Sequence, residues 1–287
     1  MSRILCLGIA TLDIINELPS YPKEDSEVRA LRQRICRGGN AANTAGVLAQ
    51  AGHQVDFCGV LADDSGAQII RQSFIEQGIG IKAHVQSGGT TPTSYITSSL
   101  ESGSRSIVHY RDLQELNAAD LPIDSFSSEY DWIHCEARNV EQLLIIITKL
   151  RQAYPQAQLS IEIEKEREAV DSLFSLADVL MLSKPFAQGR GWECAENALS
   201  AMKDNAPTSI ISQTWGSSGA GVYHAESGYS FHAAKPIEVV DSIGAGDTFN
   251  AVLIDGLLQA KSPSDAVRRA MNKATDKCTR EGFDGVL

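Results

Sequence analysis

The sequence predicts an α/β protein: a central, mostly parallel β-sheet flanked by helices, with a small β-sheet lid. Short apolar runs rich in β-branched residues alternate with helical runs over most of the 287 residues. The strand-like runs are continuously apolar, which is typical of strands buried on both faces. Two segments, Glu27–Arg37 and Thr91–Arg111, interrupt this order and predict a second, smaller sheet.

The main sheet and its helices follow one another along the chain. We expect strands at Ile4–Ala10, Gln54–Ala62, Asp131–Cys135, Gln158–Ile163, Val179–Ser183 and Ser209–Gln213. We expect helices at Asn40–Ala51, Asp64–Gln77, Val140–Ala153, Ala245–Leu258 and Ser264–Arg280. Ligands in such folds bind beyond the carboxyl ends of the strands.

The two interrupting segments predict an inserted sheet. Glu27–Arg37 alternates apolar and polar residues, and strand-like runs follow at Thr93–Ser99 and Ser106–Tyr110. No low-complexity linker or internal repeat divides the chain. We therefore predict a single domain over residues 1–287, with a lid or dimer surface inserted from about residues 14–37 and 91–111.

Composition excludes several functional classes. The 36 acidic against 25 basic residues give a net charge of −11, whereas proteins that bind nucleic acid carry a basic excess. No apolar run is long enough to cross a membrane, and the first residues resemble a buried strand rather than a signal peptide. Six scattered cysteines without a C-x-x-C pair predict free thiols, and the histidines lack the spacing of zinc ligands. We expect a cytoplasmic protein.

The turn Asp241–Asp247 (DSIGAGD) is the most specific chemical signal. Gly244 and Gly246 on either side of Ala245 let the backbone approach a ligand closely, and the N–H groups that open the following helix form an anion site. A carboxylate at Asp247 would repel that anion. A general base that takes a proton from an alcohol attacking a phosphate explains Asp247 better than binding does. The alternative is a glycine turn with a capping aspartate.

A second motif, RGGNAAN at Arg37–Asn43, opens the first long helix. Asn40 and Asn43 lie three residues apart, so their amides share a helical face and suit a polyol; the alternative is an ordinary helix cap. Asp13, just past the first strand, is either an acceptor for sugar hydroxyls or a turn residue.

Three further segments have two interpretations each. Thr214–Gly221 could cradle phosphates or form a hairpin loop, and it lacks the GK[ST] of a P-loop. The charged run Ile161–Arg167 is typical of a solvated strand end. Asp63 and Asp64 are better interpreted as a helix cap than as a metal pair.

The motifs RGGNAAN and DSIGAGDTFN resemble the two signatures of the ribokinase-like (PfkB) carbohydrate kinases, which are ATP-dependent sugar kinases with a central α/β domain and a small β-sheet lid. Within this family the chain is similar to the ketohexokinase (fructokinase) subfamily. The stretches that carry this similarity span the chain: Tyr21–Glu27, Gly103–Val108, Trp132–Asn139, Glu162–Glu168 and Gly282–Leu287.

The resemblance implies a role for each matching residue. The general base would be Asp247, with the anion hole at Gly244, Ala245 and Gly246, and Arg105 reaching sugar and transferred phosphate. The sugar site would comprise Asp13, Gly39, Asn40 and Asn43, with Asp25 presented to the partner subunit's sugar. The nucleotide site would comprise Lys184, Thr214, Gly216, Gly219, Phe249 and Cys278.

One departure concerns the metal. Many family members carry an Asn-x-x-Glu motif that organises Mg²⁺ and phosphate, where this chain has Ser183–Phe186 (SKPF). Ketohexokinases share the departure, so we assign Mg²⁺ no direct protein ligand and expect Lys184 to contact phosphate. The resemblance implies ATP and Mg²⁺, with room for a monovalent cation such as K⁺ near the 241–247 turn. It also implies a homodimer formed through the lid.

The predicted reaction transfers the ATP γ-phosphoryl group to a ketose hydroxyl, for example fructose to fructose 1-phosphate. Another kinase of the family, acting on a different sugar, sugar phosphate, sugar acid or nucleoside, is one alternative. A catalytically silent sugar sensor is a second. A nicotinamide dehydrogenase is disfavoured because no G-x-G-x-x-G follows the first strand.

Overall fold

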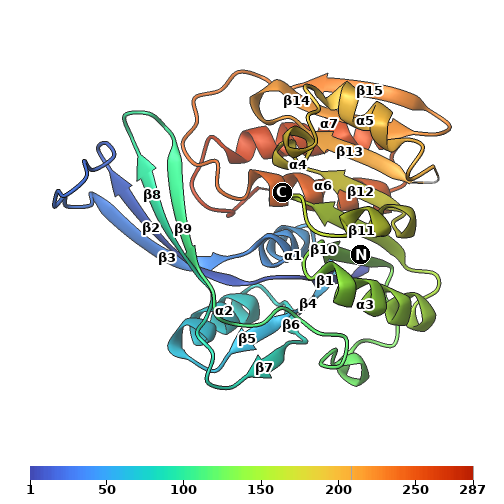
Figure 1. Cartoon of the computed structure of the whole chain (residues 1–287), viewed down its shortest axis with the longest axis horizontal. Helices are drawn as coiled ribbons and strands as arrows, with labels where there is room; N and C mark the ends of the chain where they lie inside the picture. The colour runs from blue at the N-terminus through green and yellow to red at the C-terminus, as the bar shows by residue number, and fades with distance from the viewer. Residues whose placement is uncertain (208, 287) are drawn as a thin grey trace.

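The computed structural model describes residues 1–207 and 209–286, and its main body is a nine-stranded sheet covered by helices (Figure 1). From edge to edge the strands are β15 (Gly228–Ala233), β14 (Gly219–His224), β13 (Ile210–Thr214), β12 (Val179–Leu182), β11 (Gln158–Ile163), β10 (Trp132–Glu136), β1 (Arg3–Leu7), β4 (Gln54–Cys58) and β6 (Gly80–Ile81). Only β14 and β15 run antiparallel to their neighbours. The prediction of a mostly parallel sheet is confirmed.

Helices cover both faces of this sheet. They are α1 (Asn40–Gln50), α2 (Ser65–Glu76), α3 (Val140–Ala153), α4 (Lys184–Gly189), α5 (Ala195–Met202), α6 (Ala245–Leu258) and α7 (Pro263–Lys277). Successive strand residues alternate between two apolar cores: Leu5 packs with α3, α4 and α5, whereas Ile4 packs with α1, α6 and α7. Because both faces are covered, the strands contain the uninterrupted apolar runs on which the prediction rested.

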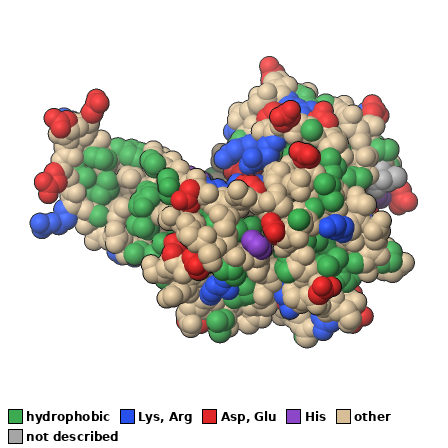
Figure 2. Space-filling view, turned by 60° about the horizontal axis from the view of Figure 1, so that its bottom comes forward, with side chains coloured by type: hydrophobic (Ala, Val, Ile, Leu, Met, Phe, Trp, Pro, Cys, Tyr) green, Lys and Arg blue, Asp and Glu red, His purple; other side chains and the backbone are tan. Residues whose placement is uncertain are grey.

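A four-stranded small sheet projects from the body (Figure 1). Its order is β3 (Arg32–Gly38), β2 (Thr11–Leu18), β8 (Thr93–Ser99) and β9 (Arg105–Tyr110). One face carries a row of apolar side chains in register across the four strands, formed by Ile35, Ile14, Tyr95 and Val108. We call this the outer row. Figure 2 shows hydrophobic side chains along the projecting sheet and charged ones at its tip.

The structure corrects the predicted strands at two places. The first strand ends at Leu7, and the chain continues into β2. A side chain at Gly8, in the connection between them, would collide with Glu136. The run 54–62 divides into β4 and β5 (Val60–Ala62), which pairs with β7 (His84–Gln86) instead of joining the main sheet. Between β4 and β5 the chain passes the Gly8 carbonyl so closely that Gly59 has no room for a side chain.

Other expectations are confirmed. The five predicted helices are present, and the Asp64 carboxylate caps α2 by accepting a hydrogen bond from the Ala67 N–H. All six cysteines are free. No helix in the described part of the chain is long and apolar enough to span a bilayer.

Gly39, the N-cap of α1, provides a test of the junction between the small sheet and the body. Its φ is 97°, and an added Cβ would lie 2.4 Å from the Ile9 carbonyl oxygen. We predict that Gly39→Ala lowers the free energy of unfolding by roughly 2–4 kcal/mol in urea denaturation. The control is Gly52→Ala, where φ is 85° and nothing lies within 4 Å of the added Cβ; it should lose about 1 kcal/mol. Equal losses would show that crowding at Ile9 has no effect.

Candidate active site

The two signature motifs meet at the carboxyl ends of the parallel strands, because α1 and α6 pack side by side (Figure 1). The Asn43 amide on α1 donates a hydrogen bond of 2.8 Å to the Asp247 carboxylate in the first turn of α6. Both side chains are buried. Two residues separated by 204 positions in sequence thus form one polar contact. It places the Asn43 amide, a group suited to sugar hydroxyls, against the candidate base Asp247.

The start of α6 has the geometry of an anion site. Gly244 is the N-cap in a left-handed conformation with φ of 74°. A Cβ there would lie 2.0 Å from the Phe283 ring, so only glycine fits. In the first helical turn the Ala245 N–H contacts the Ser242 carbonyl at 3.4 Å, whereas the Gly246 and Asp247 N–H groups have no backbone acceptor among the described residues. Nothing lies within 4 Å of a Cβ built on Gly246, which leaves room for a ligand above these donors.

Asp247 ionises with difficulty at this position. It is buried, and burial raises the pKa of its carboxyl to about 8, although the hydrogen bond from Asn43 acts in the opposite direction. The carboxylates of Glu136, Glu164 and Asp13 contribute to the same rise. A carboxyl with an elevated pKa is a stronger base once it is deprotonated, as proton abstraction from an alcohol requires.

Two buried glutamates stand beside this base. Glu136 and Glu162 are register partners at the ends of β10 and β11, so their side chains point to the same face of the sheet. Glu136 accepts a bond of 2.9 Å from the Ile9 N–H, and the Asn40 amide donates to Glu162 at 3.3 Å. The pKa of Glu162 is raised well above its usual value by burial and by the charge of Asp247. Its second oxygen has no partner among the described residues.

The interpretation of 161–167 as a solvated strand end is therefore wrong for Glu162. β11 lies inside the sheet with covered neighbours on both sides, so its last residues stay buried. The alternative of an Asn40 helix cap is also excluded, since Gly39 is the N-cap and no side chain caps α1. The Asn40 and Asn43 amides are directed at Glu162 and Asp247 instead.

Asp13 reaches the site from β2 of the small sheet. Its carboxylate is buried and accepts a hydrogen bond of 2.7 Å from the Thr11 hydroxyl. A Cβ on Gly38 of the adjacent strand would lie 2.1 Å from a carboxylate oxygen of Asp13, so the glycine makes room for it. Burial raises the pKa of Asp13. Asp13 is thus a strand residue and not a turn residue.

Arg105 and Asp25 lie at different distances from the turn. The Arg105 guanidinium at the start of β9 donates to the Ser242 hydroxyl, so it spans from the small sheet to the anion turn. Asp25 is exposed in the loop between β2 and β3, with φ of 55°. This loop forms the far tip of the small sheet (Figure 1). The structure brings Arg105 to the candidate site but leaves Asp25 outside it within one chain.

The predicted nucleotide residues divide into two groups. Lys184 opens α4, and its ammonium lies 5.7 Å from the centre of the Trp215 ring, next to Thr214 at the end of β13. The segment 214–221 comprises the end of β13, a short turn and the first residues of β14, which pair antiparallel; Gly216 and Gly219 both adopt positive φ. Phe249 is buried in the apolar core, and Cys278 is half-buried with its carbonyl accepting from the Val240 and Asp241 N–H groups.

Comparison with known proteins identifies the family to which this chain belongs. The pattern of the pfkB family of carbohydrate kinases matches residues 1–285. The chain belongs to this family. It is 35% identical to the ketohexokinase of Mus musculus over 99% of both chains, and 25% identical to the aminoimidazole riboside kinase of Salmonella typhimurium over 91% of this chain and 82% of that one. The ribokinase of Giardia lamblia superposes with a TM-score of 0.84 at 17% identity, covering 100% of this chain and 96% of that one.

As a pfkB kinase, the chain is an ATP-dependent sugar kinase that works with Mg²⁺. No group of three His, Cys, Asp or Glu side chains within residues 1–207 and 209–286 could enclose a metal ion. The glycine-lined start of α6 fits one phosphate group, and the Lys184 ammonium offers a positive charge to a second phosphate group. Mg²⁺ is commonly held by phosphates and water with few protein ligands, and this arrangement suits such binding.

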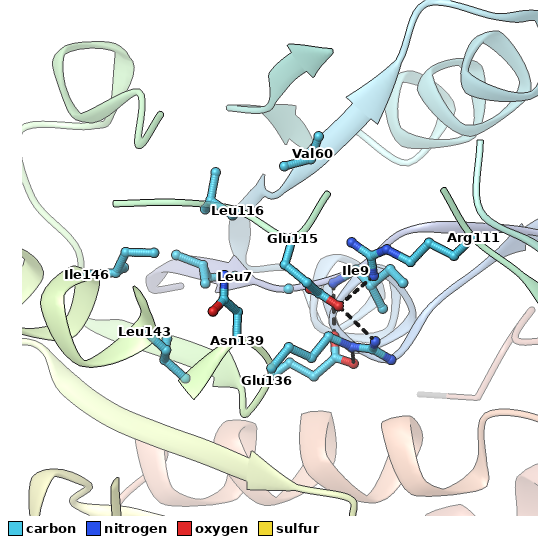
Figure 3. Close-up of a pocket in the computed structure, with 12 residues that line it drawn as sticks. Leu7, Ile9, Val60, Arg111, Glu115, Leu116, Glu136, Asn139, Leu143 and Ile146 are labelled. Atoms are coloured by element: carbon cyan, nitrogen blue, oxygen red, sulfur yellow. Dashed lines mark hydrogen bonds and ion pairs between the residues drawn. The ribbon is translucent and has the colours of Figure 1, made fainter. Parts of the chain in front are cut away.

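A hollow beside Glu136 was not anticipated from the sequence (Figure 3). Arg138 donates to Glu136 at 2.6 Å and to Glu115 at 3.3 Å, and Arg111 also pairs with Glu115. These ion pairs fix the orientation of Glu136, whose other oxygen receives the Ile9 N–H. Glu136 is thereby held against the connection between β1 and the small sheet, because Ile9 lies in that connection.

The raised pKa of Asp247 predicts a stability change with pH. Because the folded-state pKa of about 8 exceeds the ordinary 3.8, ionisation of this carboxyl opposes folding. The stability of the fold is therefore unaffected by this carboxyl below its ordinary pKa of 3.8. It is lost progressively as the pH rises from there to the folded-state pKa of about 8. Asp247→Asn cannot ionise, so its melting temperature should exceed that of the unmodified chain, by a few degrees near pH 8 and less near pH 5.

The measurement is calorimetry across this pH range, with Asp276→Asn as control, since Asp276 is an exposed carboxylate on α7. A melting-temperature difference for Asp247→Asn that stays constant with pH would contradict the elevated pKa.

Proposed function

We propose that this kinase transfers the γ-phosphoryl group of ATP to a hydroxyl of a ketose, converting fructose to fructose 1-phosphate. The contact between Asp247 and Asn43 carries the proposal, because it joins a base at an anion site to a side chain suited to a sugar. The similarity to mouse ketohexokinase supports a ketose, since its 35% identity extends over 99% of both chains, against 25% for the riboside kinase.

In this mechanism the sugar lies between the small sheet and the body. Asp13 accepts hydrogen bonds from its hydroxyls, and the Asn40 and Asn43 amides donate to or accept from others. The attacking hydroxyl gives its proton to the Asp247 carboxylate as the new O–P bond forms and the bond from the γ-phosphorus to ADP breaks. Mg²⁺, when bound, neutralises charge on the nucleotide phosphates.

The chain's own donors stabilise the transferring group. The N–H groups at Gly244, Ala245 and Gly246 face the charge that develops on the phosphoryl oxygens, and this kind of stabilisation is often the largest catalytic contribution. Arg105 adds a positive charge from the small sheet, and its contact with Ser242 holds it beside the turn. Lys184 and the 214–219 loop bind the nucleotide, with Phe249 and Cys278 on the adenine side.

The proposed function is tested by an acceptor panel in an ATP-consumption assay. Fructose and related ketoses, aldoses, sugar phosphates, sugar acids and nucleosides are compared by kcat/KM. The proposal expects the ketose to be preferred. Ribose or a nucleoside as the preferred acceptor would overturn the ketose assignment but leave the kinase assignment standing. Binding of sugar and ATP without turnover would show that the chain is a catalytically silent sensor.

Asp247→Asn should reduce turnover about 10²–10⁴-fold, the usual contribution of a general base, with the KM for sugar nearly unchanged. Asp276→Asn makes the same chemical change at an exposed position and should keep wild-type turnover. Near-wild-type turnover of Asp247→Asn would exclude this residue as the base.

We also propose that the small sheet acts as a lid and forms a homodimer through its outer row. Ile35 and Tyr95 are each 49% exposed and Val108 is 69% exposed, and they lie side by side in register. An exposed apolar stripe across a sheet is typical of an interaction surface. In such a dimer, the tip of one small sheet would bring Asp25 to the sugar of the partner.

Asp25→Ala should therefore raise the KM for sugar roughly 10- to 100-fold, the effect of losing a hydrogen bond to a charged group. Glu24→Ala, next to it in the same loop, is the matched control and should have little effect. Mixing Asp25→Ala with Asp247→Asn creates hybrid dimers in which one site has both native side chains. Low-KM activity should then return in about a quarter of all sites. Failure of the mixture to regain it would exclude a role across subunits.

A further inference from the structure

The face of the small sheet opposite the outer row carries a row of polar side chains. Asp13 on β2 pairs in register with Ser94 on β8, and Ser94 pairs with His109 on β9. Register partners point to the same face of a sheet, so Ser94 and His109 project from the same side as Asp13. Arg105, two pairs away from His109 along β9, lies on this face as well and reaches the anion turn. We call Asp13, Ser94 and His109 the inner row.

The Ser94 hydroxyl links the two ends of the inner row. It lies 3.2 Å from Nδ1 of His109. It also forms a hydrogen bond to Asp13 that opposes the rise in the pKa of this carboxyl caused by burial. Ser94 is buried, whereas His109 is exposed on the edge strand of the small sheet. The serine thus fixes one nitrogen of an imidazole whose other side is open.

These contacts determine which nitrogen of His109 carries the proton. The Ser94 hydroxyl has a single proton, which it donates to the Asp13 carboxylate, so it accepts from His109. Nδ1 is therefore the N–H group, and Nε2 has a free lone pair. Nε2 makes no hydrogen bond to any residue within 1–207 and 209–286. The inner row thus ends in an acceptor directed away from Ser94.

His109 faces the main body across the candidate site. Partial burial lowers its pKa, and the charges of Arg138, Arg111 and Lys165 act in the same direction, against the charge of Asp13. Arg138 and Lys165 follow β10 and β11 at the carboxyl ends of the main sheet. The imidazole is therefore neutral near pH 7. It lies on the side of the small sheet where the proposed mechanism places the sugar.

We propose that His109 is a specificity-determining residue of the acceptor site. Its Nε2 accepts a hydrogen bond from one hydroxyl of the bound sugar, a hydroxyl other than the one that is phosphorylated. Asp13 holds neighbouring hydroxyls from the same row, so the small sheet recognises the acceptor at two points. This inference rests on the proposed function, because it takes the sugar to lie between the small sheet and the body.

The experiment combines removal of the imidazole with removal of single sugar hydroxyls. The unmodified chain and His109→Leu are assayed with fructose and with its monodeoxy derivatives that keep the phosphorylated hydroxyl. We expect His109→Leu to raise the KM for fructose roughly 3- to 10-fold, the usual effect of one neutral hydrogen bond. Its kcat should change less than about twofold, since His109 does not contact the transferring group.

One monodeoxy sugar should have nearly the same KM with both proteins, because neither pair can form the hydrogen bond to Nε2. The other monodeoxy sugars should keep the 3- to 10-fold difference. This pattern is the signature of a direct contact, since a loss of general support for the site would affect every sugar alike. His109→Gln, whose side-chain amide can replace Nε2 as an acceptor, should recover part of the affinity.

The matched control is His232→Leu. His232 on β15 also binds a serine hydroxyl through its ring, with Nε2 at 3.0 Å from the Ser264 Oγ. It lies on the far edge strand of the main sheet. The same substitution at this position should leave the KM unchanged for every sugar.

An unchanged KM for fructose in His109→Leu would overturn the proposal. A KM increase of the same size for every deoxy sugar would also overturn it and leave His109 a support for Asp13. If the acceptor panel selects another acceptor, that compound and its monodeoxy derivatives replace fructose in the same comparison. Failure of the proposed function is recognised separately, because the unmodified chain would then not turn over fructose.

Discussion

The candidate site depends on keeping a carboxylate buried at the positive end of α6, the same end that holds the phosphoryl group in the proposed mechanism. Asp247 would be easier to ionise in water, and three nearby carboxylates make its ionisation harder still. The hydrogen bond from Asn43 and the first-turn N–H groups of α6 offset part of this repulsion. A structure in which α1 and α6 did not pack together would leave Asp247 without its amide donor. The packing of these two helices therefore serves both folding and chemistry.

The second constraint is the way in which two sheets share one site. β1 runs to Leu7 in the body and the chain continues within a few residues into β2 of the small sheet, which carries Asp13. The connection is fixed by the Ile9 N–H on Glu136 and by the close approach of Gly39 to the Ile9 carbonyl. The small sheet also contacts the turn directly through Arg34 and Arg105. The position of the small sheet thus determines how well the anion turn is covered.

Local signals made much of this predictable. Gly244, Asp247 and the Asn40–Asn43 pair were found because turn glycines and helix starts depend on neighbours in sequence. Glu162 was misjudged because its burial depends on strand order, which charge patterning does not reveal. His109 was missed for a related reason: nothing in its own strand marks it, and only the register of β2, β8 and β9 places it in one row with Asp13. The edge hairpin β14–β15 and strand β2 were also missed, since glycines and polar residues interrupt their apolar runs.

The distribution of side chains between the two sheets has an evolutionary consequence. The proposed phosphate site lies on α6 and the turn before it, whereas the small sheet carries Asp13, Arg105 and the exposed loop with Asp25. In the proposed mechanism, substitutions on β2, β3 and β8 at positions that do not contact the turn alter the acceptor side of the site and leave the N-terminus of α6 unchanged. Under the proposed function, such a division lets one scaffold diversify its acceptors by changing the small sheet, and it directs the search for new specificities in the laboratory to the strands of that sheet.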